Sequence, residues 1–286
     1  MRLIVYYDLF DHPLTLPELR AMCDADPTSA VDVLAARGHV ERTGRWVHVP
    51  GRAGQIPKRQ ARAAAAERAW PAAKRAGRFL AGFPWVRAVF VTGSLSKRSA
   101  EPDGDVDFLL VVCPGRVWSA RSALQSIRRV LPSSARESLC TNYIVSADAL
   151  AIPDRTPFHA MELATAVPLH GPEAAVALLR ANPWVAGFVP GYSWSLERAG
   201  KAAPLTGWGR ALEALGSDAV DARLRGAWDR FWSRKYGFLD PAALAHRFRR
   251  STGASTNHLH DHSARVNRAL VTRCAALGVP VPELDG

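Results

Sequence analysis

The chain has 286 residues, of which 48% are hydrophobic, and a formal net charge of +11. This length is enough for two or three domains with a sizeable core. No apolar run approaches 18 residues and the first residues lack a cleavage-site pattern, so we expect a cytoplasmic protein without a membrane partner. The four cysteines are far apart, with no CxxC spacing, which is typical of reduced thiols. The positive charge, mostly arginine, favours a partner that carries phosphate, either a nucleotide or a nucleic acid.

Residues 1–51 are predicted to form a winged helix-turn-helix. An apolar-rich helix covers Leu3–Phe10, and "TLPE" places Thr15 and Glu18 in a capping box at the start of a second helix. A third helix, in "DPTSAVDVLAARGHV", ends at Gly38, and "VERTGRWVHV" has the alternation of a hairpin.

The third helix of this module is poorly suited to reading DNA. Between Pro27 and Arg37 there is one Arg and one Asp, with no Asn, Gln or Lys to contact base edges. Packing or protein contact is therefore favoured over sequence-specific DNA binding for residues 1–51.

Residues 52–150 are predicted to form an α/β domain behind a leading helix at 57–81. That helix and the residues just before it carry eight basic residues, and Glu67 is their one acidic residue. The basic face of the helix is therefore either solvated or directed at phosphate. Strands are expected in "VRAVFVTG", "VDFLLVV" and "SLCTNYIV", with an amphipathic helix in "VWSARSALQSIRRVL". Residues 151–286 are expected to form a helical C-terminal domain, which makes the whole chain α+β, a mixed sheet with helices.

The cluster "DGDVD" at residues 103–107 concentrates acid at the start of a predicted strand. A calcium EF-hand loop is excluded, because its sixth and twelfth positions would be Phe108 and Pro114. Turn chemistry explains Asp103 but not Asp107. Alternate strand residues point to one face, so Asp105 and Asp107 present paired carboxylates, which are hard ligands suited to Mg²⁺ or Mn²⁺.

Small residues end the preceding strand at Gly93-Ser94, where backbone N–H groups can approach a phosphate. Gly93-Ser94, ten intervening residues and Asp105-Val106-Asp107 together resemble the signature of the DNA polymerase β-type nucleotidyltransferase superfamily. The resemblance covers residues 86–145. Arg98 and Gly104 depart from it, standing where many members have Gly and Ser, and neither departure removes a metal ligand.

The wider layout, with segments such as "YYDLFDHPLTLPEL" and "MELATAVPLHG", resembles a bacterial group of nucleotidyltransferase-like proteins with an N-terminal winged helix. The superfamily usually has a third carboxylate on a later strand. At the centre of the corresponding strand this chain has Asn142, which can ligate a metal but cannot act as a carboxylate base. Glu137 and Glu162 are the candidates to replace that carboxylate.

The resemblance implies an enzyme with a nucleotidyltransferase-fold sheet that transfers a nucleoside monophosphate from an NTP, with ATP the expected one. Asp105 and Asp107 would hold the metal, Gly93 and Ser94 would bind the triphosphate, and the acceptor would be a hydroxyl of a small molecule, a protein or an RNA. Pyrophosphate would leave.

Three basic residues are candidates to neutralise the phosphates, namely Lys97, Arg98 and Arg121, with Arg121 ranked first. The alternative is a catalytically weak regulator that binds nucleotide or DNA, of a toxin–antitoxin type.

Two further clusters lie near the C-terminus. His258, His260 and His262 beside Asp261 form a zinc candidate, but only His258 and His262 share a helical face, so surface or packing roles are favoured. "HRFRR" at 246–250 is a hypothetical basic wall for nucleotide or acceptor phosphate.

Overall fold

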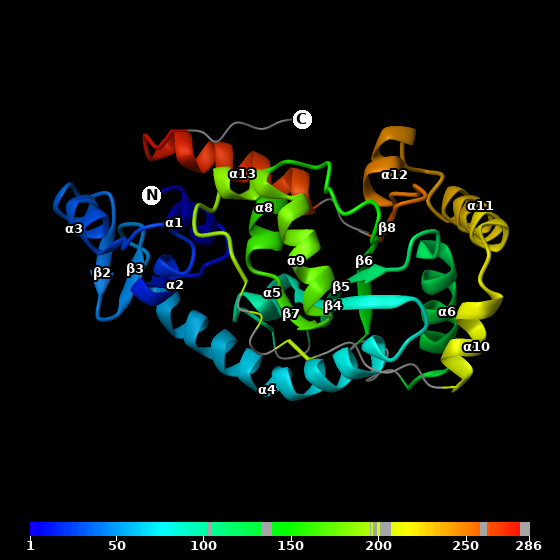
Figure 1. Ribbon diagram of the computed structural model, residues 1–286. Coiled ribbons are helices and arrows are strands. Elements are labelled where there is room, and N and C mark those ends of the chain that lie inside the picture. Colours follow the sequence, from blue (N-terminus) through cyan, green and yellow to red (C-terminus); the bar gives the residue numbers. More distant parts are fainter. Residues whose placement is uncertain are drawn as a thin grey trace.

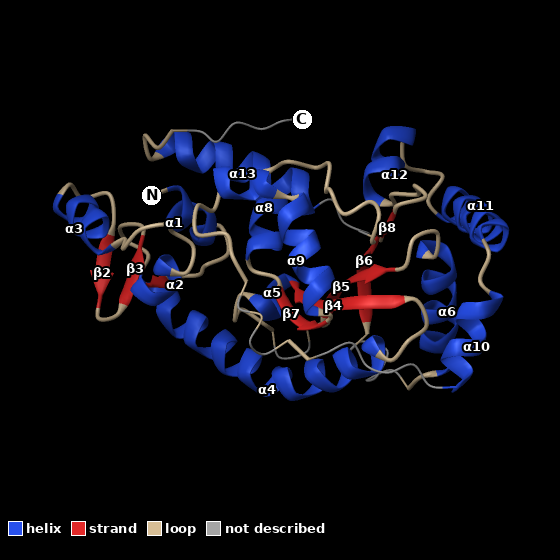
Figure 2. Ribbon diagram, viewed as in Figure 1, coloured by secondary structure: helices blue, strands red, loops and turns tan. Residues whose placement is uncertain are grey.

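The computed structural model describes residues 1–101, 104–132, 139–194, 196, 199–200, 207–257 and 262–280. It shows an α+β protein with a mixed five-stranded sheet and a separate small antiparallel sheet (Figures 1 and 2).

The first 48 residues form an N-terminal unit of short helices around the small sheet, whose strand order is β1-β3-β2. Its elements are α1 (Arg2–Asp8), β1 (Leu14–Thr15), α2 (Leu16–Arg20), α3 (Thr28–Ala36), β2 (Glu41–Thr43) and β3 (Trp46–His48). The predicted capping box is confirmed: Glu18 N–H donates to Thr15 Oγ1 at 3.4 Å, and Thr15 N–H donates to Glu18 Oε2 at 2.8 Å. The predicted hairpin is confirmed as β2 and β3, with Gly44 left-handed in the turn at φ +57°.

The long helix α4 (Ile56–Ala81) follows the 3₁₀ turn η1 (Ala53–Gln55) and runs from the N-terminal unit to the five-stranded sheet (Figure 1). The basic residues of its first half are largely used internally. Arg59, only 2% exposed, donates to Glu18 Oε1 at 2.6 Å, and Arg62 pairs with Glu101. The helix thereby ties the N-terminal unit to the rest of the chain, and its remaining basic residues are exposed.

The five-stranded sheet has the order β7-β4-β5-β6-β8, in which β5 and β6 are parallel and the other neighbours are antiparallel. Its strands are β4 (Val86–Thr92), β5 (Asp107–Val112), β6 (Cys140–Ser146), β7 (Val167–His170) and β8 (Ala254–Thr256).

Helices cover both faces of this sheet (Figures 1 and 2). The helices that follow β4 are, in chain order, α5 (Gly93–Ser96), α6 (Val117–Val130), α8 (Pro157–Ala164), α9 (Pro172–Ala181), the 3₁₀ turn η2 (Pro183–Gly187), α10 (Gly207–Leu215), α11 (Asp218–Lys235), α12 (Pro241–Arg247) and α13 (His262–Ala276). Within the described ranges, no helix combines the length and apolarity needed to cross a membrane.

Alternation along β5 divides the core into two layers. Phe108 and Leu110 belong to the layer with α4, α6 and α11, whereas Leu109 and Val111 pack with α8 and α9. Asp107 comes two residues before Leu109, so its side chain lies on the same face of the sheet, the face covered by α8 and α9. The sheet therefore positions a carboxylate at one end of that layer.

The segment expected to be helical beyond residue 151 also supplies both edge strands of the sheet. β7 pairs with β4, and β8 pairs with β6. These strands, "VPLH" and "AST", are too short and too mixed in polarity to give a two-residue period, which is why the sequence did not predict them. The predicted boundary at 150 therefore falls inside the unit that the sheet builds, because two of its strands come from the C-terminal half.

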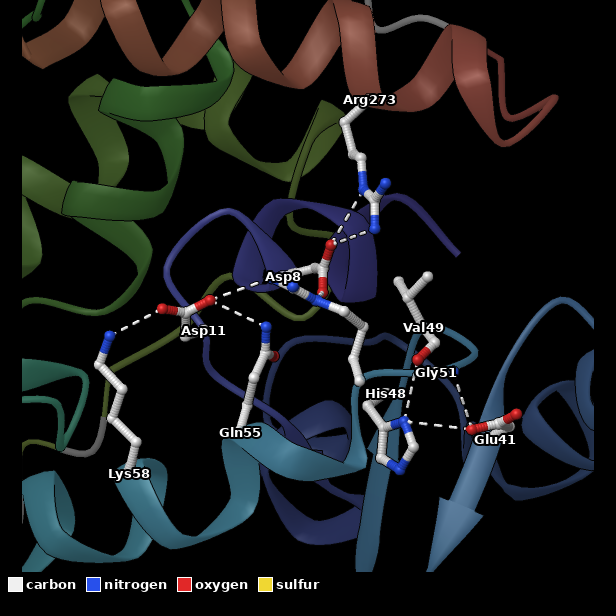
Figure 3. Close-up of polar contacts among 10 residues, drawn as sticks. Asp8, Asp11, Glu41, His48, Val49, Gly51, Gln55, Lys58 and Arg273 are labelled. Atoms are coloured by element: carbon white, nitrogen blue, oxygen red, sulfur yellow. Dashed lines mark hydrogen bonds and ion pairs between the residues drawn. The ribbon is translucent and has the colours of Figure 1, made fainter.

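Two aspartates at the end of α1 join three parts of the chain (Figure 3). Asp8, whose side chain is 5% exposed, accepts from Arg52 Nε at 2.9 Å and from Arg273 Nε of α13 at 3.0 Å. Asp11 accepts from Gln55 Nε2 and from Lys58 Nζ, each at 2.8 Å. We call Asp8 with Arg52 and Arg273 the Asp8 junction. It fixes α1 against α13 and against the chain that leads into α4.

Candidate active site at the β4–β5 edge

The turn after β4 lies directly against the first residue of β5. Thr92 pairs with Asp107 across the antiparallel ladder, and Gly93 follows with φ +69°. A Cβ at position 93 would collide with Asp107 Oδ2, so both the backbone conformation and the close approach require glycine. Gly93 and Asp107, which the sequence predicted to face each other, are brought together here.

Asn142 lies beside Asp107 on the neighbouring strand β6, two residues after Cys140, which pairs with Asp107. Phe108 pairs with Thr141 and Leu109 with Tyr143, so the ladder skips Asn142 as a bulge. Asn142 Nδ2 donates to Asp107 Oδ1 at 2.5 Å, and Asn142 Oδ1 accepts from Cys140 Sγ at 3.1 Å. An amide, in place of a third carboxylate, thus faces Asp107.

Negative charge is concentrated around Asp107. Asp105 is exposed in the loop before β5, while Val106 between them is buried in the core. Burial, the charge of Glu162 and then that of Asp105 raise the pKa of Asp107 to about 7. Asp107 is therefore partly protonated near neutral pH unless a cation offsets this charge.

Glu162 of α8 holds the turn after β4. Its Oε2 accepts from Gly93 N–H at 3.1 Å, and its Oε1 accepts from Lys97 Nζ at 2.7 Å. Lys97 also donates to the Gly93 carbonyl at 3.1 Å. Burial acts to raise the pKa of Glu162, but Lys97 and the Gly93 N–H lower it, so the carboxylate is ionised. One carboxylate thus occupies both the backbone donor and the lysine that the sequence predicted to bind phosphate.

The structure does not bring Arg98 or Arg121 to this edge. Arg98 is exposed and pairs with Glu67 at 2.9 Å. Its backbone φ is +55°, in the left-handed region, which glycine adopts without the strain that a side chain causes. Arg121 is buried beneath the sheet, where its guanidinium donates to the carbonyls of Thr141 at 3.3 Å and Ser255 at 3.0 Å. It ties α6 to β6 and β8, in the core layer on the other face of the sheet from Asp107.

The donor set at this edge fits a divalent cation that substrate completes. Asp105 and Asp107 offer carboxylate oxygens, and burial together with the charges of Glu162 and Asp105 raises the pKa of Asp107, which a bound cation would lower. The Asn142 amide presents its nitrogen, not its oxygen, to Asp107. In the part of the chain that the structure describes, no three His, Cys, Asp or Glu side chains group as metal ligands. Mg²⁺ is typically held by one or two carboxylates and substrate phosphates, so such a site does not need three.

A cavity of about 470 Å³ opens from this edge. Gly93, Ser94, Lys97, Asp107 and Glu162 line its polar end, together with Asn142. Its other walls come from α1, α8 and α13, so the N-terminal unit and the C-terminal helices enclose it jointly with the sheet.

The two C-terminal clusters are divided by the structure. His262 and Arg247 line the cavity, whereas Arg250 pairs with Asp229 on α11 at 2.6 Å. Arg249 donates to Asp154, also a cavity residue, at 2.6 Å. The remaining candidates Asp103, Glu137, His258, His260 and Asp261 lie outside the described residues.

The cavity wall that α1 and the turn after it supply was not predicted from the sequence. Tyr6, Tyr7, Phe10 and His12 line the cavity, although "YYDLFDH" had indicated only a helix of the N-terminal module. Burial and nearby cations lower the pKa of His12 to about 3, so its ring is neutral there. The available signal was an aromatic-rich helix too short to bury its side chains within its own unit.

No known protein family, curated protein or solved structure matches this chain.

Proposed function

We propose that this chain is a nucleotidyltransferase with a nucleotidyltransferase-type sheet and an N-terminal winged helix. It transfers the nucleoside monophosphate of an NTP, with ATP the expected donor, to an acceptor hydroxyl. A bond forms between the acceptor oxygen and the α-phosphorus, the bond from that phosphorus to the bridging oxygen breaks, and pyrophosphate leaves.

One observation carries this proposal: the carboxylate of Asp107, two residues after the exposed Asp105, lies beside a left-handed glycine turn at the polar end of a cavity. The turn has a backbone N–H and a lysine in reach of a single anion, as the Glu162 contacts demonstrate. The raised pKa of Asp107 supports a cation between that anion site and the diad. Anion and cation sites side by side are what a metal-bound triphosphate requires.

Asp105 and Asp107 would hold Mg²⁺ or Mn²⁺. The Asn142 amide, whose oxygen accepts from Cys140 Sγ, would have to turn over to add its oxygen to them. When bound, the metal neutralises phosphate charge and favours pyrophosphate as a leaving group. Gly93 N–H, Ser94 and Lys97 bind the triphosphate, which takes over the contacts that Glu162 now makes.

Glu162 is then the third carboxylate of the proposed site. Released from Lys97, it lies at the boundary between the phosphate contacts and the rest of the cavity. It accepts the proton of the acceptor hydroxyl as that oxygen attacks phosphorus. This assignment replaces the base that Asn142 cannot provide.

The test is incubation with each α-labelled NTP and Mg²⁺ or Mn²⁺, with and without RNA and small-molecule alcohols, following both label and pyrophosphate. Asp105→Ala and Asp107→Ala should each lower metal-dependent transfer by more than about a hundred-fold. Asp24→Ala, an exposed acid on the N-terminal unit, is the matched control and should transfer at the native rate.

Incorporation that persists in either diad variant contradicts the assignment. Saturable NTP binding with no transfer under any condition supports the alternative, a nucleotide-binding regulator. Salt-sensitive DNA binding by the full chain would extend that alternative to a DNA-binding regulator.

A further inference from the structure

The cavity extends well beyond the groups needed for a triphosphate. Its other walls are apolar and aromatic, formed by Tyr7 of α1, Phe10 in the turn after it, Leu109 of β5, Phe158 of α8 and Val266 of α13. At about 470 Å³ it is in the size range of small-molecule sites, which are mostly apolar with a few placed polar groups. Side chains from α1 and α13, the first and last described helices, close the cavity. It is therefore not an open groove along which a polymer could lie.

Two tyrosine hydroxyls in these walls are buried and have no hydrogen-bond partner among the described residues: those of Tyr6 and Tyr143. Tyr6 is only 3% exposed. A buried hydroxyl left without a partner costs free energy, so such groups normally have one. Both tyrosines line the cavity, so a ligand there would provide it once the ring turns its hydroxyl toward the cavity.

The surroundings of these hydroxyls locate them. Burial and the charge of Glu162 raise the pKa of Tyr6, which places its hydroxyl within the field of that carboxylate. Burial raises the pKa of Tyr143 to about 12, with Arg249 and Asp154 as its charged neighbours. The two unpartnered donors therefore serve different parts of one cavity.

Charge around the cavity favours an uncharged ligand. Asp107, Asp154 and Glu162 line it beside Lys97 and Arg247, and Asp154 is paired with Arg249, so neither sign of charge is in clear excess. A triphosphate brings its metal and takes over Lys97, but an acceptor has no such compensation.

The walls are held in place before a ligand arrives. The Asp8 junction fixes α1 to α13, and the buried Arg59–Glu18 pair fixes the N-terminal unit to α4 (Figure 3 shows the former). A preformed cavity loses little ordering free energy on binding.

We infer that this cavity binds a small uncharged molecule with an apolar, ring-bearing body and at least one hydroxyl, which Tyr6 and Tyr143 hydrogen-bond. We further infer that this molecule is the acceptor, a step that rests on the proposed function. Its hydroxyl loses a proton to Glu162 and forms the new bond to the α-phosphorus, and pyrophosphate carries away the electrons of the broken bond.

Binding is tested first, with the full chain and no nucleotide, by calorimetry using 2-naphthol, naphthalene and 2-naphthoate. The expected order is 2-naphthol tightest, naphthalene weaker and 2-naphthoate weakest. Tyr6→Phe and Tyr143→Phe should each weaken 2-naphthol by roughly three- to ten-fold and leave naphthalene unchanged. Tyr192→Phe is the matched control, since its hydroxyl is also buried without a partner within the described chain but does not line the cavity.

Ser263→Trp fills the cavity from the start of α13, and Ala275→Trp places the same side chain on an exposed position of that helix. Ser263→Trp should abolish 2-naphthol binding and Ala275→Trp should preserve it, while both bind Mg²⁺-ATP as the native chain does. Equal 2-naphthol affinity in both tryptophan variants, tighter 2-naphthoate binding, or no saturable binding of any probe overturns the inference.

Failure of this inference is distinguishable from failure of the proposed function. If Ser263→Trp instead loses Mg²⁺-ATP and retains 2-naphthol, the nucleobase occupies the apolar walls and the acceptor assignment is wrong. If tyrosine-dependent probe binding holds but no NTP labels any alcohol, the cavity site stands and nucleotidyl transfer does not. If transfer occurs and Ser263→Trp leaves the labelled acceptors unchanged, the enzyme stands and the acceptor site does not.

Discussion

Glu162 satisfies at once the two groups of the β4–α5 turn that we assign to phosphate. Its carboxylate receives Gly93 N–H and Lys97 Nζ, with Lys97 only 11% exposed. A partly buried lysine without a neighbouring anion would cost free energy of folding. The Lys97–Glu162 ion pair therefore keeps the turn stable in the absence of nucleotide. A triphosphate has more negative charge than one carboxylate and can take over both contacts.

Gly93→Ala tests whether the turn is built around Asp107. The left-handed φ should cost about 1 kcal/mol of unfolding free energy, and the collision with Asp107 Oδ2 should add to it and abolish transfer. Gly44→Ala is the matched control, because Gly44 is also left-handed but an added Cβ meets nothing within 4 Å.

Urea unfolding and label transfer are compared for both variants. Gly44→Ala should lose only the backbone contribution and keep native transfer. Equal losses of stability with native transfer in both variants would show that the contact between Gly93 and Asp107 has no part in activity.

At the level of elements, a bulge in β6 falls at the residue that faces Asp107. In a regular ladder Asn142 would pair with Leu109, and its side chain would lie on the same face of the sheet as Asp107. The bulge leaves Asn142 without a partner in the ladder, and its side-chain amide donates to the Asp107 carboxylate. An amide stabilises an ionised neighbour without metal, which a carboxylate could not do.

Asn142→Asp exchanges that donor for a second negative charge. Without metal, we expect a loss of about 2 kcal/mol in unfolding free energy, because a hydrogen bond is replaced by repulsion of Asp107. Mg²⁺ should restore most of this loss and raise label transfer.

Asn142→Ala is the comparison, since it removes the hydrogen bond and adds no charge. Its stability should not recover with Mg²⁺. Unfolding of Asn142→Asp that is insensitive to Mg²⁺ would place the metal away from Asp107.

Features of this site could be predicted from the sequence to the extent that they are local. The approach of Gly93 to Asp107 was predictable, because consecutive antiparallel strands bring the end of one to the start of the next. The Gly93–Glu162 contact spans 69 residues and depends on how α8 packs, which no local pattern encodes. Arg121 was predicted at a phosphate because its helix comes after the diad strand, but helical periodicity does not say which basic residue is buried.

At the level of the whole molecule, the N-terminal unit is a wall of the cavity as much as a module of its own. Tyr6 and Tyr7 contribute to a core with Val266 and Leu270 of α13. The Asp8 junction connects the same two helices through charge. Separation of the unit from the body would therefore open the cavity.

Asp8→Ala should loosen this arrangement. It leaves two arginines, each about a third exposed, without their shared acceptor, so we expect a loss on the order of 2 kcal/mol in unfolding free energy after allowing for solvent screening. Affinity for 2-naphthol should fall with it, as measured by calorimetry. Asp32→Ala removes an exposed ion pair with Arg42 and should change neither quantity. Equal affinities in the two variants would show that the junction does not shape the cavity.

The Asp8–Arg273 contact spans 265 residues of sequence, which has a consequence for synthesis of the chain. A ribosome delivers α1 long before α13, so the aromatic side chains of α1 emerge without the helix that covers them. Contacts of such long range form late, after the loop entropy between them has been overcome. The nascent N-terminal unit therefore presents apolar surface through most of translation, and the cavity is completed only when α13 docks.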